Sequence, residues 1–459
     1  MRGRRCSLPS DALFGPSSST DHMLAATSEG AWLAAILRVE AALAGAGSHL
    51  GLIPHNAAEA ISAHCGVEGY DIGQLGREAV RYANPAAPIV NALRDKVGKE
   101  AASFVHLGAT SQDVLDTAMM LIAQKGLGLV LEDLDRAARA ASTLADRHRS
   151  TLMAARTLMQ QAVPTTFGLK AAGWLSAIVD ARVDVARVLG TRLAVQFGGA
   201  AGTLASLRAR GLEVAQTMAA ELGLREPLLP WHTTRVRVVE VANALGLAAG
   251  VAGKVALDVL LLAQTEVAEV SEGARAGQGG SSTLPHKHNP VQAIEILAAV
   301  RSVNAQIALL QGTMLQEHER AAGAWQAEWP ALSETLRSAG GAVGRLADLL
   351  SGLEVDADRM RRNLDMTGGL IMAESVVMAL SERVDGRTAR TLVDRAVSVA
   401  RSTGRRFAEV LKEDRDVSAR LNEGELTEAL NPATYLGASA QLIDRALDAY
   451  RRQGKETND

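Results

Sequence analysis

A loop rich in glycine and serine carries the residue types best suited to chemistry in this chain. Residues 279–290 read GGSSTLPHKHNP. A serine can exchange a proton when nearby positive charge and N–H donors lower its pKa. A lysine can neutralise a carboxylate or a developing oxyanion, and an asparagine amide can orient one. Ser281, Lys287 and Asn289 are therefore candidates for proton transfer, charge neutralisation and orientation, with Ser282 as a further contact.

Other interpretations of this loop are possible. Its composition also suits a solvated linker, although long loops in compact helical proteins are usually functional. His286 and His288 lie two residues apart with no acidic or cysteine partner nearby, so we do not expect a metal site. A P-loop is excluded, because no Gly-Lys-Ser/Thr follows the glycines.

The sequence on both sides of the loop predicts long helices. Prolines are absent between Ile89 and Val163, between Thr165 and Glu226, and between Ala331 and Asn431. Proline is costly inside helices, so such stretches favour them. Aromatic residues make up only 3% of the chain, and the alternation typical of strands is nearly absent. The expected fold class is all-α.

The region from Val238 to Val270 is apolar almost all round. One side of the predicted helix carries Val251, Val255, Val259, Leu262 and Val270. A helix that is apolar all round must be covered all round, which favours a homo-oligomer built through central helices. One large monomeric bundle is the alternative. The uncharged core of the region, residues 241–253, is too short to span a bilayer, so no membrane span is expected.

Length, charge and cysteine content exclude several classes of protein. A chain of 459 residues allows about three domains or one large architecture. A net charge of −3 argues against a nucleic-acid scaffold and a polybasic membrane binder. Cys6 and Cys65 are too few for a disulfide framework and fit a reducing compartment. No apolar segment follows the basic start, so we predict no signal peptide and a soluble, cytoplasmic protein.

Three segments together resemble the fumarase/aspartase superfamily. The loop is similar to the signature Gly-Ser-Ser-x-Met-Pro-x-Lys-x-Asn-Pro, with Leu284 in place of methionine, a change that conserves volume. Residues 106–117, HLGATSQDVLDT, resemble the region His-x-Gly-x-Thr-Ser-x-Asp. Residues 156–168, RTLMQQAVPTTFG, resemble the region Arg-Thr-His-x-Gln-x-Ala-x-Pro-x-Thr-x-Gly. The segments occur in the order found in the superfamily and span most of the chain.

The resemblance implies a fold and an assembly. We expect three helical domains, at residues 1–108, 109–355 and 356–459. The central domain carries the loop 273–290 and contributes a long five-helix bundle, and four copies of the chain form a twenty-helix core. Active sites are expected where the three segments, each from a different subunit, meet.

The resemblance also implies roles for individual residues. The superfamily adds or eliminates groups across a carbon–carbon bond next to a carboxylate, through a dianion that needs hydrogen bonds and positive charge. The match assigns proton transfer to Ser281 and makes His106 a second catalytic residue. The expected substrate-binding residues are Asn84, Thr110, Ser111, Gln112, Arg156, Gln160, Ser282, Lys287, Asn289, Arg320 and Trp325.

One departure from the superfamily indicates the branch. Leu158 stands where fumarases and adenylosuccinate lyases carry a histidine that supports protonation of the departing group. A departing hydroxide or amine needs such an acid, but a carboxylate, whose conjugate acid has a pKa of ~4, does not. The chain resembles the 3-carboxy-cis,cis-muconate cycloisomerase family, including at residues 84–88, 317–329 and 431–437.

The resulting expectation is a cofactor-independent cycloisomerase. A carboxylate of a tricarboxylate substrate adds across a conjugated diene and closes a lactone, with no metal, nucleic acid or membrane involved. Another lyase of the superfamily, such as an adenylosuccinate lyase, is the first alternative, and Leu158 counts against it. A catalytically silent structural protein is the second, and Ser281, Lys287 and Asn289 count against that.

Several of these residues also have structural interpretations. Trp325 and Trp329 lie four residues apart and equally suit the core face of one helix. Arg320 could form a surface ion pair, although a tricarboxylate substrate favours ligand contact. We interpret Leu158 as a packing residue that lines the pocket.

Overall fold

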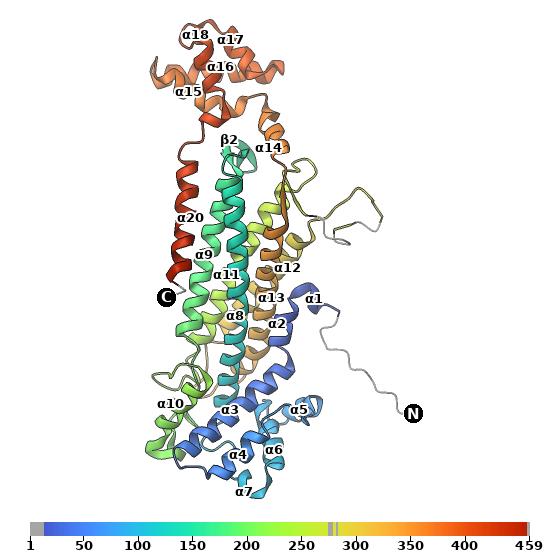
Figure 1. Cartoon of the computed structure of the whole chain (residues 1–459), viewed down its shortest axis with the longest axis vertical. Helices are drawn as coiled ribbons and strands as arrows, with labels where there is room; N and C mark the ends of the chain where they lie inside the picture. The colour runs from blue at the N-terminus through green and yellow to red at the C-terminus, as the bar shows by residue number, and fades with distance from the viewer. Residues whose placement is uncertain (1–12, 274–278, 281–282, 457–459) are drawn as a thin grey trace. The chain divides into compact units, whose positions relative to one another are not determined.

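The computed structural model describes residues 13–273, 279–280 and 283–456. These residues form α-helices α1 to α20 and two small two-stranded sheets, so the predicted all-α class is confirmed (Figure 1). The chain divides into two compact units. The first unit comprises Met1–Asp135, Asp180–Lys254 and Ile294–Leu346, and the second comprises Arg136–Val179, Val255–Ala293 and Ala347–Asp459. The predicted division into three domains stays a prediction.

Five long helices contribute residues to both units. They are α8 (Ser111–Arg147), α9 (Phe167–Thr191), α11 (Val236–Leu262), α12 (Val291–Gly312) and α13 (Ala324–Gly352). The shorter elements of the first unit are α1 (Gly15–Ser18), α2 (Asp21–Ala26), α3 (Glu29–His49), α4 (His55–Ala63), α5 (Ile72–Ala79), α6 (Ala86–Lys96), α7 (Gly98–Ala102), η1 (Ala205–Arg210) and α10 (Gly211–Leu222).

Glycines bring the long helices of the first unit close together. A Cβ at Gly126 of α8 would lie 2.6 Å from Leu336 Cδ2 of α13. A Cβ at Gly253 of α11 would lie 3.0 Å from Val300 Cγ2 of α12. Interiors are close-packed, so a larger residue would push the neighbouring side chain away. The absence of a side chain at these positions therefore sets the spacing of the helices that carry the candidate site.

Two helix boundaries differ from the sequence prediction. α11 ends at Leu262, and Val270 instead lies in strand β3, so it does not belong to the helical stripe. α13 begins at Ala324 and continues through Pro330, although proline-free stretches were expected to delimit helices. Pro330 is the seventh residue of α13, so it has no N–H to donate to the carbonyl oxygen of Gln326, and the packing of the long helix must offset that loss.

A β-hairpin in the second unit was not predicted. Strands β1 (Leu152–Thr157) and β2 (Gln160–Thr166) pair in antiparallel fashion. The two residues between them, Leu158 and Met159, have φ angles of 49° and 66°, in the left-handed region that favours glycine and asparagine. Leu158 is 97% exposed, so its interpretation as a packing residue is wrong within the chain. The apolar side chains at the tip of the hairpin are therefore exposed to solvent in the single chain.

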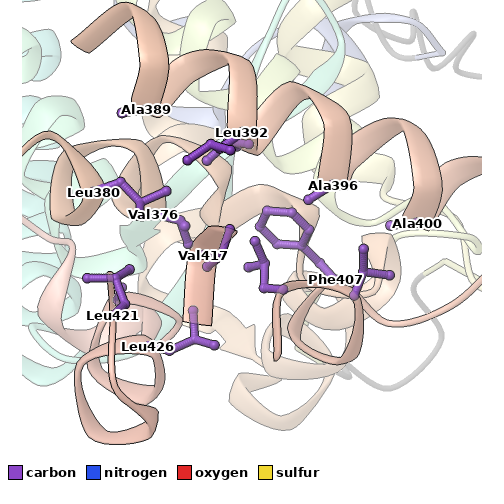
Figure 2. Packing of buried hydrophobic residues seen from close by; sticks show 14 residues of the cluster. Val376, Leu380, Ala389, Leu392, Ala396, Ala400, Phe407, Val417, Leu421 and Leu426 are labelled. Carbon is purple, nitrogen blue, oxygen red and sulfur yellow. The ribbon is translucent and has the colours of Figure 1, made fainter. Parts of the chain in front are cut away.

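The second unit closes with a cluster of small helices. These elements are α14 (Ala357–Leu364), η2 (Asp365–Thr367), η3 (Leu370–Met372), α15 (Ala373–Ser381), α16 (Gly386–Thr403), α17 (Phe407–Glu413), α18 (Arg415–Ser418), α19 (Glu423–Ala429), η4 (Pro432–Thr434) and α20 (Ser439–Glu456). Strands β3 (Val270–Glu272) and β4 (Leu353–Val355) pair beside them. In Figure 2, Ala389, Ala396 and Ala400 of α16 lie along one face, above Phe407 and Val417. The helical repeat of small residues allows this close packing.

Among the described residues, four helices are each long and apolar enough to cross a membrane by length and composition alone. They are α3, α8, α11 and α12, which differs from the expectation that no segment would be long enough. The buried share of the most apolar stretch is 72% in α8 and 61% in α3, but 50% in α11 and 28% in α12. The chain itself therefore covers α8 and α3 and leaves much of α12 uncovered.

Candidate active site

The N-terminus of α8 carries two of the predicted substrate-binding residues, Thr110 and Ser111. The first N–H groups of a helix lack partners inside the helix and, together with the helix dipole, attract anions. Thr110 and Ser111 are half-buried, and no hydrogen bond within the described part of the chain engages their hydroxyls. This end of α8 can therefore offer both N–H and hydroxyl donors to a carboxylate.

His106 lies in the loop before α8 and is fixed by a buried carboxylate. Its Nδ1 lies 2.6 Å from Oε1 of Glu40 on α3, whose side chain is fully buried. His106 has a φ of 66°, a conformation that residues other than glycine rarely adopt. Donation from Nδ1 to Glu40 leaves the Nε2 lone pair to accept a proton or a hydrogen bond. The imidazole ring is therefore held in one orientation, and its Nε2 is available for acid–base chemistry or hydrogen bonding.

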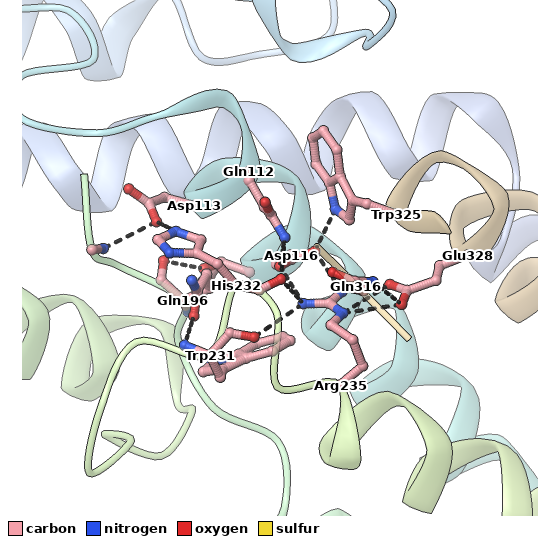
Figure 3. A network of polar contacts seen from close by, with 12 residues as sticks. Gln112, Asp113, Asp116, Gln196, Trp231, His232, Arg235, Gln316, Trp325 and Glu328 are labelled. Carbon is pink, nitrogen blue, oxygen red and sulfur yellow. Dashed lines mark hydrogen bonds and ion pairs between the residues drawn. The ribbon is translucent and has the colours of Figure 1, made fainter. Parts of the chain in front are cut away.

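Asp113 connects the start of α8 to two other segments (Figure 3). Its Oδ2 accepts hydrogen bonds from the backbone N–H of Thr110 at 3.0 Å and of Gly199 at 2.9 Å. Its Oδ1 accepts from the backbone N–H of Gly198 at 3.0 Å and lies 2.6 Å from Nε2 of His232. Asp113 is almost fully buried, so these contacts replace the water that the carboxylate has lost.

The segment that meets Asp113 requires glycine at two positions. A Cβ at Gly198 would lie 2.6 Å from Cε1 of His232 and 2.8 Å from Cβ of Pro230. Gly199 has a φ of +69°, and a Cβ there would lie 3.0 Å from the carbonyl oxygen of Gly108. Both glycines allow the backbone to approach the carboxylate closely.

Arg320 is held by backbone carbonyl groups, two of which belong to the segment of Gly198 and Gly199. Its guanidinium donates to the carbonyl oxygens of Gly199 at 2.6 Å, Ala200 at 3.0 Å and Glu319 at 2.8 Å. No ion pair of Arg320 is found among the described residues. Burial lowers the pKa of Arg320, and the charges of Asp113 and Asp116 oppose that shift. The side chain therefore keeps a positive charge that no neighbouring carboxylate contacts.

A fully buried ionic cluster lies one helical turn further along α8. Arg235, in the turn directly before α11 (Val236–Leu262), donates to both carboxylate oxygens of Asp116, at 2.7 and 2.9 Å. It also donates to Glu328 of α13 at 2.5 to 3.1 Å. Burial raises the pKa of Glu328, and the charge of Arg235 opposes that shift. The two carboxylates hold the pKa of Arg235 above its usual value despite its burial.

Two predicted substrate-binding residues lie inside this network. The amide nitrogen of Gln112 donates to the carbonyl oxygen of His232 at 2.7 Å and to Asp116 at 3.2 Å. The indole nitrogen of Trp325 donates to Asp116 at 2.9 Å, and its ring packs edge-on against Trp329 at 4.8 Å. Both residues are buried, and their polar groups order the network that supports the end of α8.

The side chain of Asn84 stabilises the turn that precedes α6. Its side-chain oxygen accepts from the backbone N–H of Ala87 at 3.1 Å, and its amide nitrogen donates to the carbonyl oxygen of Tyr82 at 3.0 Å. Both ends of the amide are thus engaged by nearby backbone.

In the second unit, Arg156 of β1 forms a bidentate pair with a buried glutamate. Its guanidinium donates to Glu269 at 2.6 and 2.9 Å, and Glu269 is fully buried. Asn363 donates to the same carboxylate at 2.8 Å. The charge of Arg156 is therefore largely neutralised within the chain. Gln160 is exposed beside the hairpin tip and donates to the carbonyl oxygen of Met159.

The base of the signature loop is closed by backbone pairing. The N–H of Asn289 donates to the carbonyl oxygen of Gly279 at 2.8 Å, and Gly280 bridges to His288. Lys287 is exposed and Asn289 is half-buried. Ser281 and Ser282 lie outside the described residues. The pairing places Lys287 and Asn289 immediately before α12.

One hollow beside Asn289 does not suit an anion. It is lined by four carboxylate side chains, those of Glu272, Glu354, Asp356 and Asp358. Glu272 accepts from the backbone N–H groups of Gln292 and Ala293 and so caps the start of α12. Four carboxylates at one hollow disfavour binding of an anion there.

The described predicted residues are divided between the two units. The first unit contains Asn84, His106, Thr110, Ser111, Gln112, Arg320 and Trp325, and the second contains Arg156, Gln160, Lys287 and Asn289. The sequence interpretation did not assign Glu40, Asp113, His232 or Arg235 to the site. Asp113 stands inside the matched segment 106–117, which was a usable signal, whereas the other three are recognised only through their contacts.

Comparison with known proteins gives consistent matches over nearly the whole chain. The lyase family matches residues 13–308, and the family described as adenylosuccinate lyase C-terminus matches residues 369–446. A 3-carboxy-cis,cis-muconate cycloisomerase from Bradyrhizobium diazoefficiens is 44% identical over 443 residues, covering 96% of this chain and 98% of that protein. A nitrosuccinate lyase from Streptomyces davaonensis is 45% identical over 446 residues, covering 95% of this chain and 94% of that protein.

A solved structure is also similar. The crystal structure of 3-carboxy-cis,cis-muconate lactonizing enzyme from Pseudomonas putida matches with a TM-score of 0.91 at 40% identity, covering 96% of this chain and 99% of that one. At this identity the likeness extends to sequence as well as to fold.

Replacing Arg235 with methionine should leave two buried carboxylates without a cation. We expect R235M to lower the free energy of unfolding by about 3–5 kcal/mol at neutral pH. The pKa of Glu328, already raised by burial, rises further without Arg235. A raised carboxyl pKa adds stability at low pH and loses it as the pH increases, so the deficit of R235M should shrink towards about pH 5. Chemical denaturation across this pH range measures both effects.

Arg237, in the first turn of α11, provides a matched control two residues further along the chain. It is half-buried and donates to the carbonyl oxygen of Arg192 at 2.7 Å. We expect R237M to cost about 1 kcal/mol, with no comparable change over this pH range. Equal losses in the two variants would show that Arg235 contributes packing rather than charge compensation.

Proposed function

Since the chain belongs to the lyase family, we propose that it is a cofactor-independent cycloisomerase that converts 3-carboxy-cis,cis-muconate to carboxymuconolactone, a step in aromatic catabolism. Relatives named for this activity cover almost the whole chain at 43–44% identity. The observation that carries the proposal is the aliphatic hairpin tip, in which Leu158 replaces the acid histidine of related lyases. A leaving group that is itself a weak base needs no acid at that point.

The chemistry requires one proton transfer and no redox step. An oxygen of one substrate carboxylate forms a C–O bond to the diene, and the displaced electron pair moves onto the far carboxylate as an aci-carboxylate dianion. Ser281 then gives its hydroxyl proton to the α-carbon and regains a proton from solvent, and the reverse reaction removes the proton from that carbon. The resulting lactone is an isomer of the substrate.

Positive charge and hydrogen-bond donors stabilise the dianion and orient the three carboxylates. The end of α8 with Thr110 and Ser111 binds one carboxylate, and Arg320 supplies a cation beside it. Lys287 and Asn289 bind the carboxylate that becomes the dianion. Arg156 is paired with Glu269. It therefore orients the substrate rather than neutralising the charge of a substrate carboxylate.

His106 acts as an acid–base or hydrogen-bonding group at the same end of α8. Its Nε2 is the atom left available when Nδ1 donates to Glu40. A histidine held this way can steer a substrate carboxylate towards attack or relay a proton to solvent.

The active enzyme is a homotetramer in the cytoplasm, with each site built from segments of different subunits. The uncovered apolar stretch of α12 supports association, as do the exposed side chains of Leu247, Ile294 and Leu309. Apolar area of this kind on a water-soluble chain is stabilised by burial against other copies. The tetramer joins the end of α8 from one subunit to the signature loop of another.

A second candidate is elimination of a weakly basic nitrogen group. The relative named nitrosuccinate lyase is 45% identical to the chain. Nitrite, like a carboxylate, is the conjugate base of an acid of moderate strength, so its departure also needs no protonating histidine. The residue at position 158 therefore does not separate the two activities, and an assay must.

A panel of three substrates tests the proposed function. We expect rapid loss of the diene absorbance of 3-carboxy-cis,cis-muconate, with product identified as the lactone by NMR. Nitrosuccinate and adenylosuccinate should react at least 100-fold more slowly, measured by nitrite and fumarate release. Rapid nitrite release with an inert muconate would transfer the assignment to the second candidate, and rapid cleavage of adenylosuccinate would reject the argument from Leu158.

Substitution of Ser281 tests the proton-transfer step. We expect S281A to reduce kcat by a factor of about 10²–10⁴, the range typical of general acid–base groups, with little change in Tm. Ser271 is a matched control in the same unit, since its hydroxyl contacts only the exposed Glu354 at 3.1 Å. S271A should keep near-normal turnover. Near-normal kcat in S281A would remove Ser281 from the mechanism.

The assembly can be tested by placing a charge on the uncovered face of α11. L247E should shift the mass measured by light scattering from tetramer towards smaller species and abolish activity in parallel, because shared sites are lost. Leu212 of α10 is also exposed, and L212E should remain a tetramer. A wild-type mass equal to one chain would contradict the proposed assembly.

A further inference from the structure

We propose that His232 and Asp113 are positioning residues that hold Arg320 where it binds a substrate carboxylate. This inference rests on the proposed role of Arg320 and deepens it. Neither residue needs to touch the substrate, because His232 holds Asp113 and Asp113 holds the backbone segment 198–200 that carries two of the anchoring carbonyls.

Arg320 is anchored by dipoles rather than by a counter-ion. Within the described part of the chain its three hydrogen-bond acceptors are all backbone carbonyl oxygens, two of them from Gly199 and Ala200 at 2.6 and 3.0 Å. Carbonyl groups orient a guanidinium without cancelling its charge, which suits a residue that must still attract an anion. The position of the charge therefore follows the position of these two carbonyls.

Gly199 links Asp113 to Arg320 through its own backbone groups. Its carbonyl accepts from Arg320, while its N–H donates to Oδ2 of Asp113 at 2.9 Å. The same Oδ2 accepts from the N–H of Thr110 at 3.0 Å. One carboxylate oxygen thus sets the distance between the end of α8 and the segment that holds Arg320, the two groups proposed to bind substrate.

His232 contacts the other carboxylate oxygen of Asp113, Oδ1. Its Nε2 lies 2.6 Å from Oδ1, which also accepts from the N–H of Gly198. The histidine comes from a loop that is itself anchored, because its carbonyl accepts from Gln112 at 2.7 Å and the N–H of Trp231 donates to Gln196 at 2.8 Å. The ring therefore fixes the rotation of the carboxylate from a third, independent segment.

Simple helix capping does not account for this arrangement. An Asp at the third position of a helix that accepts from the residue before the helix needs one hydrogen bond, as here from Thr110. The contacts to His232, Gly198 and Gly199 lie outside that requirement, and Gly199 is the one that contacts Arg320 directly. Small displacements of a binding cation reduce affinity and orientation sharply.

Two substitutions of His232 separate positioning from packing. H232L removes the Nε2 donor, and H232Q replaces it with an amide N–H at a similar distance from the backbone. We expect H232L to raise KM by about tenfold or more with a smaller fall in kcat, because Arg320 binds the carboxylate in both the ground and transition states. H232Q should recover most of the wild-type KM.

A double-mutant cycle with R320M supplies the decisive readout. If His232 acts through Arg320, H232L should change KM less than about twofold when Arg320 is already absent. Additive effects of H232L and R320M, or no rescue by H232Q, would overturn the proposal. Should H232L fail to fold, H232N, whose shorter amide cannot reach Asp113, takes its place in the cycle.

A control variant and the choice of substrate distinguish a failure of the proposed function from a failure of the positioning role. S333A removes the hydrogen bond from Trp32 at 3.0 Å in the same unit, away from Asp113, and should leave KM unchanged. Failure of the wild-type enzyme to turn over the tricarboxylic diene would reject the proposed function, and the cycle is then run with whichever carboxylate substrate the panel identifies. Normal wild-type turnover with an additive cycle would reject the positioning role alone.

Discussion

A single buried carboxylate, that of Asp113, organises the part of the molecule that is prepared to bind an anion. Removing an ionised carboxylate from water is expensive unless its lone pairs are filled by donors. Here three backbone N–H groups and an imidazole surround it, and they come from three separate segments of the chain. Folding of these segments is therefore coupled, because each one supplies hydrogen bonds that the others cannot replace.

The side chains of α8 extend this order into the interior. Asp116 lies one turn after Gln112 and Asp113, and residues three and four apart share a face. Asp113 binds backbone, whereas Asp116 binds Arg235, which is shared with Glu328 of α13. One cation between two buried carboxylates leaves net negative charge beside Arg320. The guanidinium is thus stabilised at a distance without being neutralised by contact.

Much of the fold could be read from the sequence, because long helices are encoded by local composition. Proline-free, Ala- and Leu-rich stretches predicted the helical class, and the segment 106–117 led directly to the end of α8. The hairpin at residues 152–166 escaped prediction, since its strands are short and their burial does not alternate regularly.

The supporting residues of the site were less predictable. Glu40 and His232 are far from the matched segments in sequence and become visible only when helices and loops pack together. A lone histidine or glutamate carries no local signature of its partner. The engagement of Asn84 by its own turn and of Arg156 by Glu269 depends on such contacts as well.

The hairpin tip at Leu158 and Met159 has an evolutionary consequence. Two left-handed residues with branched or long side chains store strain on the order of 1–3 kcal/mol each, whereas Asn-Gly would adopt the same turn readily. A lineage selected for heat resistance alone would be expected to relax this turn. With Leu158 and Met159 the turn is less stable than with Asn-Gly, in exchange for the exposed apolar surface that the tip presents.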